Sequence, residues 1–78
     1  MLKGSRQAIL KRIQPISIHG QPSWEIVFTH VDDSTEQLNA ARVGPEAISA
    51  PQTLEAGDRI DVEYLFNQVI KVTRIPSA

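Results

Sequence analysis

Apolar and charged residues alternate along the last third of the chain, from Arg59 to Leu65 and again over 69–75. Successive side chains of a β-strand point to opposite faces, so Ile60, Val62 and Tyr64 share one face and the charged residues between them share the other. Two such runs, separated by a few turn-forming residues, are typical of a β-hairpin with one buried face. We therefore predict a hairpin that closes the sequence.

The length of this hairpin loop follows from parity, because a shift of one residue moves every side chain to the opposite face. A two-residue loop would place Tyr64 opposite Lys71 and mix the apolar and charged faces. A three-residue loop places Tyr64 opposite Ile70 and keeps the faces separate. We expect three residues, or five with the same parity, with a positive φ at Asn67 or Gln68.

The first part of the chain predicts a second hairpin. Residues 24–31 alternate with an aromatic face, and residues 7–18 form the preceding strand, with His19-Gly20 in the turn between them. In the first strand we place Ile9 and Ile13 on the core face and Leu10 on the other. Pro15 indicates a bend or an exposed edge, because proline cannot donate a hydrogen bond to a neighbouring strand.

The middle of the chain has two interpretations. Ser34 followed by Gln37 and an apolar run over 38–41 is a fair helix signature, yet Leu38 and Ala40 alternating with polar neighbours also fit a short strand. We favour a strand within 35–43, because the two hairpins need a partner between them. After it, Pro45 suits the first turn of a short helix that reaches about residue 49.

These elements predict one domain over residues 1–78, all-β in class. We expect a small five-stranded β-barrel or coiled sheet, with one short helical turn between the third and fourth strands, because an open sheet of this size would expose both edges. The predicted core comprises Ile9, Ile13, part of Trp24, Ile26, Phe28, Leu38, Leu54, Ile60, Val62, Tyr64, Ile70 and Val72.

The stretch LEAGDRIDVEY, residues 54–64, opens the last hairpin after the helical crossover. In this motif and in the order of its elements the chain resembles the small OB-type barrels, with the SH3-like barrels as second choice. The resemblance covers about 11 residues and concerns architecture, not one specific family. It implies an ability to bind single-stranded nucleic acid or oligosaccharides, as OB-type domains often do.

Composition and motifs give no sign of catalysis. The 78 residues include 41% hydrophobic and 22% charged residues and no cysteine, which is typical of an ordinary globular domain without disulfides or thiolate metal sites. His19 lies in a turn and His30 at the end of a strand, so both are interpreted as surface histidines. We expect a non-enzymatic protein without metal or cofactor, located in the cytoplasm and not in a membrane, because Lys11 and Arg12 interrupt the only run that could serve as a signal peptide.

Charge is divided unevenly along the chain. Residues 1–20 carry a net charge of +4, residues 21–65 carry −7 and the tail carries +2, for a total of −1. If the first and last strands are neighbours, their basic residues could form a phosphate-binding patch, with exposed aromatic side chains as platforms for bases. The candidate nucleic-acid site comprises Lys3, Arg6, Lys11, Arg12, Trp24, Phe66, Lys71 and Arg74.

The competing hypothesis is a protein-interaction or assembly module. Edge strands carry unpaired backbone groups that invite a further strand, from an unknown protein partner or from another copy of the chain. Leu65, Phe66 and Val69 form a candidate apolar interaction spot at the end of the last hairpin. We favour protein interaction over nucleic-acid binding, because the slightly acidic balance weakens the electrostatic attraction that drives non-specific nucleic-acid binding.

Overall fold

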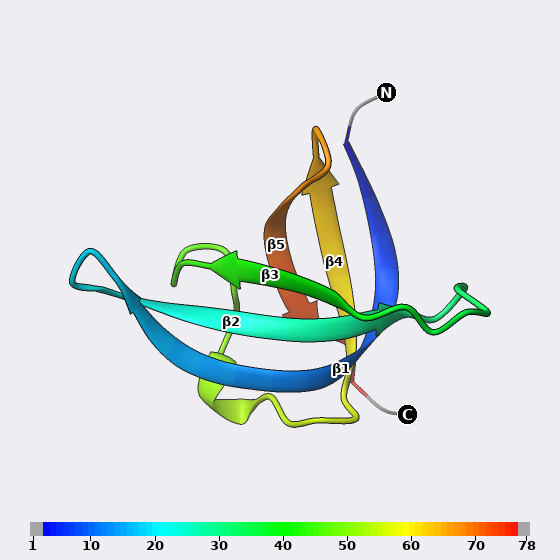
Figure 1. The fold of residues 1–78 in the computed structure, drawn as a ribbon, viewed down its shortest axis with the longest axis horizontal. Helices are drawn as coiled ribbons and strands as arrows, with labels where there is room; N and C mark the ends of the chain where they lie inside the picture. Colours follow the sequence, from blue (N-terminus) through cyan, green and yellow to red (C-terminus); the bar gives the residue numbers. More distant parts are fainter. Residues whose placement is uncertain (1–2, 77–78) are drawn as a thin grey trace.

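The computed structural model describes residues 3–76, which form a single antiparallel sheet of five strands (Figure 1). The spatial order of the strands is β3-β2-β1-β4-β5, so the long β1 lies in the middle. The predicted all-β class, with five strands and one helical turn between the third and fourth, is confirmed. The elements are β1 (Lys3–Ile18), β2 (Gln21–His30), β3 (Asn39–Val43), η1 (Pro51–Thr53), β4 (Arg59–Leu65) and β5 (Gln68–Arg74).

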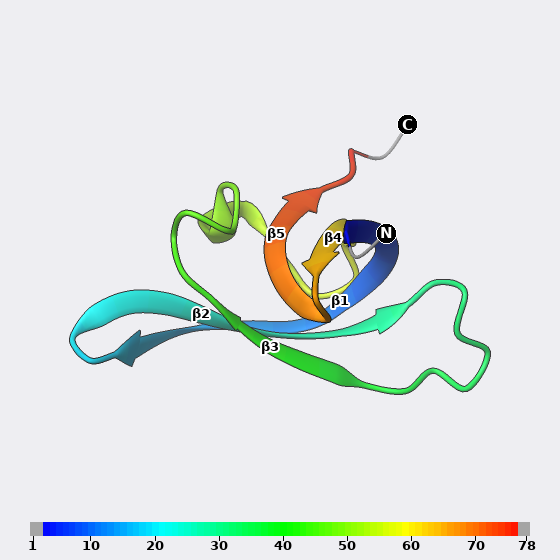
Figure 2. The ribbon, with the colours of Figure 1, turned by 90° about the horizontal axis from the view of Figure 1, so that it is seen from above.

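The β1–β2 hairpin projects from the body of the molecule (Figure 2). Its turn residues have positive φ, 51° at His19 and 80° at Gly20, as the tight hairpin turn that matches strand twist requires. Pro15 lies in the second half of β1. This half pairs with β2 alone, because β4 pairs only with Lys3–Ile9. The prediction of an exposed edge at Pro15 is therefore confirmed.

A β-bulge at Lys11 reverses which face of the sheet alternate side chains of β1 point to. Leu10 lies opposite Phe28 and Arg12 opposite Val27, which leaves Lys11 as an extra residue. Before the bulge Leu10 faces the core and is fully buried, and after it Ile13 packs against the same core. The predicted core position of Ile9 was wrong, because its neighbour Leu10 takes the inner face and Ile9 takes the outer one.

The β4–β5 hairpin also contains a bulge, which changes its predicted loop. Leu65 pairs with Gln68, so the loop has two residues, and the expected positive φ occurs at Asn67 (66°) but also at Phe66 (52°). The predicted three-residue loop and the Tyr64–Ile70 pairing were wrong. Ile70 is instead the extra residue of the bulge and is 38% exposed, which also removes it from the predicted core.

The middle of the chain forms a strand, as predicted, but a shorter one. β3 covers only Asn39–Val43 and pairs with β2, with Val43 opposite Trp24. Leu38 precedes the strand and is 63% exposed, so its predicted place in the core was wrong. Val43 is the buried apolar residue of this strand.

The helical turn lies later than residues 45–49. Residues 45–47 form a turn closed by the Ala47 amide, which donates to the Gly44 carbonyl at 3.0 Å, and Ile48 then bridges to Val72 in β5. The 3-10 helix follows at Pro51–Thr53. Ile48 is buried in the core, and its bridge to Val72 follows directly after the turn, in place of the predicted helical turn. Within residues 3–76, no helix is long and apolar enough to cross a membrane.

The sheet coils around one core but does not close into a barrel. We call the face that carries the core the inner face and the opposite one the outer face. The core residues are Ala8, Leu10, Ile26, Phe28, Val43, Ile48, Leu54, Ile60, Val62 and Val72. Ile13, Trp24 and Tyr64 pack against this cluster and are partly buried.

Candidate functional site

Three of the six predicted basic residues are opposed by carboxylates. The Arg6 guanidinium donates to Asp32 at 2.7 Å (Nη2 to Oδ1), and Arg74 Nε lies 3.7 Å from Asp58 Oδ2. Lys71 is paired with Glu63 across the β4–β5 ladder. These residues therefore do not form a uniformly positive surface.

Lys11 and Arg12 occupy a different part of the molecule, at the bulge of β1. Both are exposed, and neither forms an ion pair with any residue from 3 to 76. Arg12 donates to the Gln14 side chain, and Gln14 donates in turn to Glu25 at 3.1 Å. Lys3 lies at the other end of β1, opposite Leu65 of β4. The six basic residues thus do not converge on one patch.

The two predicted aromatic platforms differ in exposure. Trp24 is partly buried and packs against the core, so its ring is not free for a base. Phe66 is 64% exposed in the two-residue turn of the β4–β5 hairpin. Only Phe66 is therefore available for contact with another molecule.

The predicted interaction spot is rearranged by the bulge in β5. Leu65 is 37% exposed, but Val69 pairs with Tyr64 and packs against the core. Ile70 supplies the third exposed apolar side chain of this hairpin end. We call Leu65, Phe66 and Ile70 the tip patch.

A polar and aromatic cluster on the inner face was not predicted. His30 is 8% exposed, and its Nε2 lies 2.7 Å from the Tyr64 hydroxyl, while its ring packs edge-on against Phe28 with 5.5 Å between centroids. Burial, followed by the positive charge of Arg6, lowers the pKa of His30. Burial also raises the pKa of the Tyr64 hydroxyl. The interpretation of His30 as a surface histidine was therefore wrong.

The Arg6–Asp32 ion pair lies at the edge of this cluster. Its hydrogen bond raises the pKa of Arg6 and lowers that of Asp32. Asp33 has a lowered pKa too, because its carboxylate accepts hydrogen bonds from the hydroxyl and the amide of Thr35, at 2.6 and 2.9 Å. All three charged groups remain ionised near neutral pH, so within this cluster His30 is the group that changes its charge in mild acid.

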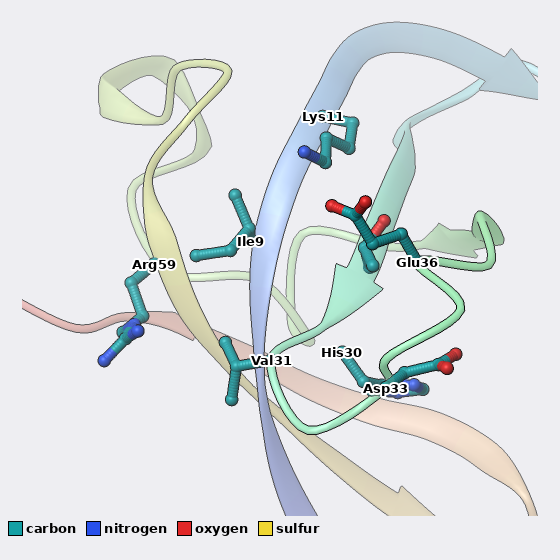
Figure 3. A pocket seen from close by; sticks show the side chains of 8 residues that line it. Ile9, Lys11, His30, Val31, Asp33, Glu36 and Arg59 are labelled. Carbon is teal, nitrogen blue, oxygen red and sulfur yellow. The ribbon is translucent and has the colours of Figure 1, made fainter.

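A cavity of about 220 Å³ lies on the outer face, between β1 and the loop that follows β2 (Figure 3). Lys11 and Glu36 point toward one another on one side of it, beside Ile9, whereas Arg59 extends away from them. Thr29 also lines the cavity, and its buried hydroxyl has no hydrogen-bond partner in the described part of the chain. The cationic and the carboxylate side chains that line the cavity balance one another, so the cavity has no marked preference for a charged ligand.

Among residues 3–76, no three side chains of the metal-ligating types are grouped closely enough to hold an ion. Comparisons of the chain with protein-family models, with curated proteins and with solved structures gave no match.

Proposed function

We propose that this domain is a non-catalytic protein-interaction module whose contact surface is the tip patch. The observation that carries the proposal is the conformation of Phe66. Its φ of 52° lies in the left-handed region, where side chains other than those of glycine, asparagine and aspartate are uncommon. A large apolar residue is thus held in solvent at a position that disfavours it.

The other hairpin of the same molecule provides a comparison. The turn between β1 and β2 has the same length and positive φ at both residues, and it uses His19 and Gly20. A small or polar residue therefore suffices for such a turn. The fold gains little from the Phe66 ring, which is not among the side chains packed against the core. Unfavourable conformations of this kind concentrate at binding sites.

Two further exposed apolar side chains lie in the same hairpin as Phe66. Leu65 ends β4, and the bulge in β5 leaves Ile70 exposed instead of pairing it with Tyr64. Aromatic side chains that present a large apolar area are enriched among the residues that dominate protein interfaces. The tip patch thus supports contact with an apolar pocket of another protein.

Site-specific photo-crosslinking in cells that produce the protein tests this proposal. A photoreactive phenylalanine analogue replaces Phe66, and the same analogue replaces the exposed Gln52 of η1 as a control. We expect a crosslinked adduct of discrete mass from position 66 and none of that mass from position 52. Equal adducts from both positions, or none from position 66, would contradict the proposal.

Single-stranded nucleic-acid binding is the second candidate function. It is favoured by the exposed Phe66 ring and by Lys11 and Arg12, which form no ion pair with residues 3–76. The test is titration of a labelled single-stranded oligonucleotide at low and moderate salt. Binding that weakens steeply with salt and is lost in the K11E/R12E variant would favour this function, and no binding at low salt would exclude it.

A further inference from the structure

The two outer strands of the sheet differ in how their free edges are covered. At β5 the Val72 amide donates to the Ala47 carbonyl at 2.6 Å, and the Ser49 amide donates to the Val72 carbonyl at 3.2 Å. Along β3, residues 39–43 make no backbone hydrogen bond on the side away from β2 to any residue from 3 to 76. Of the two outermost strands, β3 is therefore the one whose free edge no described segment covers.

The side chains of β3 do not protect this edge. Natural proteins block exposed edges with lysine, proline, bulges or a covering segment. The centre of β3 is Ala40 and Ala41, and its only charge is Arg42, which lies 3.6 Å from Glu25 on β2 (Nε to Oε2). Both alanines are small and uncharged, so a further backbone can approach closely.

No described strand pairs with the free side of β3. In Figure 1 β3 crosses in front of β5, and parts of the two strands approach one another without backbone hydrogen bonds between them. Just before the strand, Leu38 is 63% exposed. An extended segment placed along β3 would continue the sheet and shield part of this apolar surface.

We propose that β3 accepts an extended segment of a partner protein as a sixth strand. The inner-facing residues of that segment are apolar, because the inner face carries the core, and the outer-facing residues are polar. An acidic residue lies beside Arg42, since opposite charges stabilise and like charges destabilise cross-strand neighbours. Backbone hydrogen bonds supply the affinity, and this charge contact supplies the selectivity.

The probe is a capped pentapeptide in which valine alternates with threonine and one glutamate, compared with the same peptide carrying lysine in place of glutamate. Binding to the isotope-labelled protein is followed by NMR. We expect the glutamate peptide, at concentrations on the order of millimolar, to shift the amides of Asn39–Val43 and not those of β5. N-methylation of alternate peptide amides along one edge should abolish these shifts.

A charge exchange provides the selectivity test. The glutamate peptide should bind about 2- to 10-fold more tightly than the lysine peptide, and R42E should reverse this preference. R12E makes the same charge change at an exposed position of β1, and this variant should keep the preference for the glutamate peptide. Shifts absent from residues 39–43, or binding unaffected by N-methylation, would overturn the proposal, as would a preference that R42E leaves unchanged.

This interaction is independent of the tip patch. The F66N variant should bind the glutamate peptide with unchanged affinity, because Phe66 belongs to the opposite edge of the sheet from β3. Peptide binding without a crosslink at position 66 would therefore contradict only the proposed function. A crosslink without peptide binding would contradict only the strand addition.

Discussion

His30 and Tyr64 are 34 residues apart in the sequence, and their side chains lie within hydrogen-bond distance of one another, 2.7 Å between Nε2 and the hydroxyl oxygen. His30 ends β2 and Tyr64 lies near the end of β4, and both strands flank β1. The charged groups near the ring are Arg6, which disfavours the imidazolium, and Asp32 and Asp33, which favour it. Burial outweighs the two carboxylates, so the pKa of His30 falls.

This lowered pKa predicts a loss of stability in mild acid. The unfolded chain binds a proton at His30 near pH 6.5, whereas the folded protein does so only at lower pH, so the free energy of unfolding decreases as the pH falls below about 6.5. Urea unfolding at pH 7.5 and pH 5.5 measures the effect. H30Q should be less sensitive to this change than the wild type, and equal sensitivity would contradict the assignment.

The lowered pKa values of Asp32 and Asp33 affect the stability of the protein in a separate, more acidic pH range. Their ionised forms are favoured in the folded protein, so their contributions are lost only as the pH falls below about 4. A decrease of stability between pH 7.5 and pH 5.5 therefore reports on His30. The sequence could not indicate this environment, because no local pattern places Tyr64 and Arg6 beside the end of another strand.

At the scale of the elements, two bulges account for the errors in the predicted register. The alternating pattern correctly predicted four of the strands and the faces of β4, and the need of the two hairpins for a partner correctly predicted the third strand. A regular strand cannot bury both Leu10 and Ile13, and the bulge at Lys11 resolves this conflict. The parity argument for the last hairpin required one additional residue, which the structure places at Ile70 and not in the loop.

Deletion of Lys11 tests the first bulge. Removing the extra residue forces either Leu10 or Ile13 away from the core side of β1, since register and facing are coupled. We expect a decrease of about 2 kcal/mol or more in the free energy of unfolding, measured with urea. K11A keeps the bulge and should change stability by no more than about 0.5 kcal/mol. Equal stability of the two variants would contradict this role of the bulge.

The misplaced helical turn has a tertiary cause. Pro45 does begin a turn, as its preference for such positions indicates, but the chain must next deliver Ile48 to the core beside β5. The bridge to Val72 ends the turn early and moves the 3-10 helix to Pro51–Thr53. This contact joins residues of distant segments, so sequence periodicity alone could not reveal it.

For the whole molecule, stability depends on one small core enclosed by a coiled sheet. Leu10 is fully buried in the central strand, whereas Leu38 is 63% exposed outside the sheet. L10A should lower the free energy of unfolding by about 2–5 kcal/mol, because it leaves a cavity. L38A should change it by about 0.5 kcal/mol or less. Urea unfolding of both variants checks this contrast, and similar losses would contradict the assigned core.

The candidate surfaces were only partly visible in the sequence. Strand alternation placed Leu65 and Phe66 at a hairpin end, and this exposure is confirmed. The basic patch required the first and last strands to be neighbours, but β4 lies between β1 and β5. Residues 47–49 cover the edge of β5 at Val72, whereas no described segment covers β3, and no local pattern encodes this difference between the two edges.

The most direct test of the central claim is the thermal unfolding midpoint of F66N compared with the wild type. If Phe66 is kept at the hairpin tip for a partner and not for the fold, asparagine at this left-handed position should raise the midpoint by about 4 °C or more. Q68N, at the neighbouring exposed position, should leave it unchanged. A lower midpoint for F66N would show that the ring stabilises the fold and would contradict the proposed function.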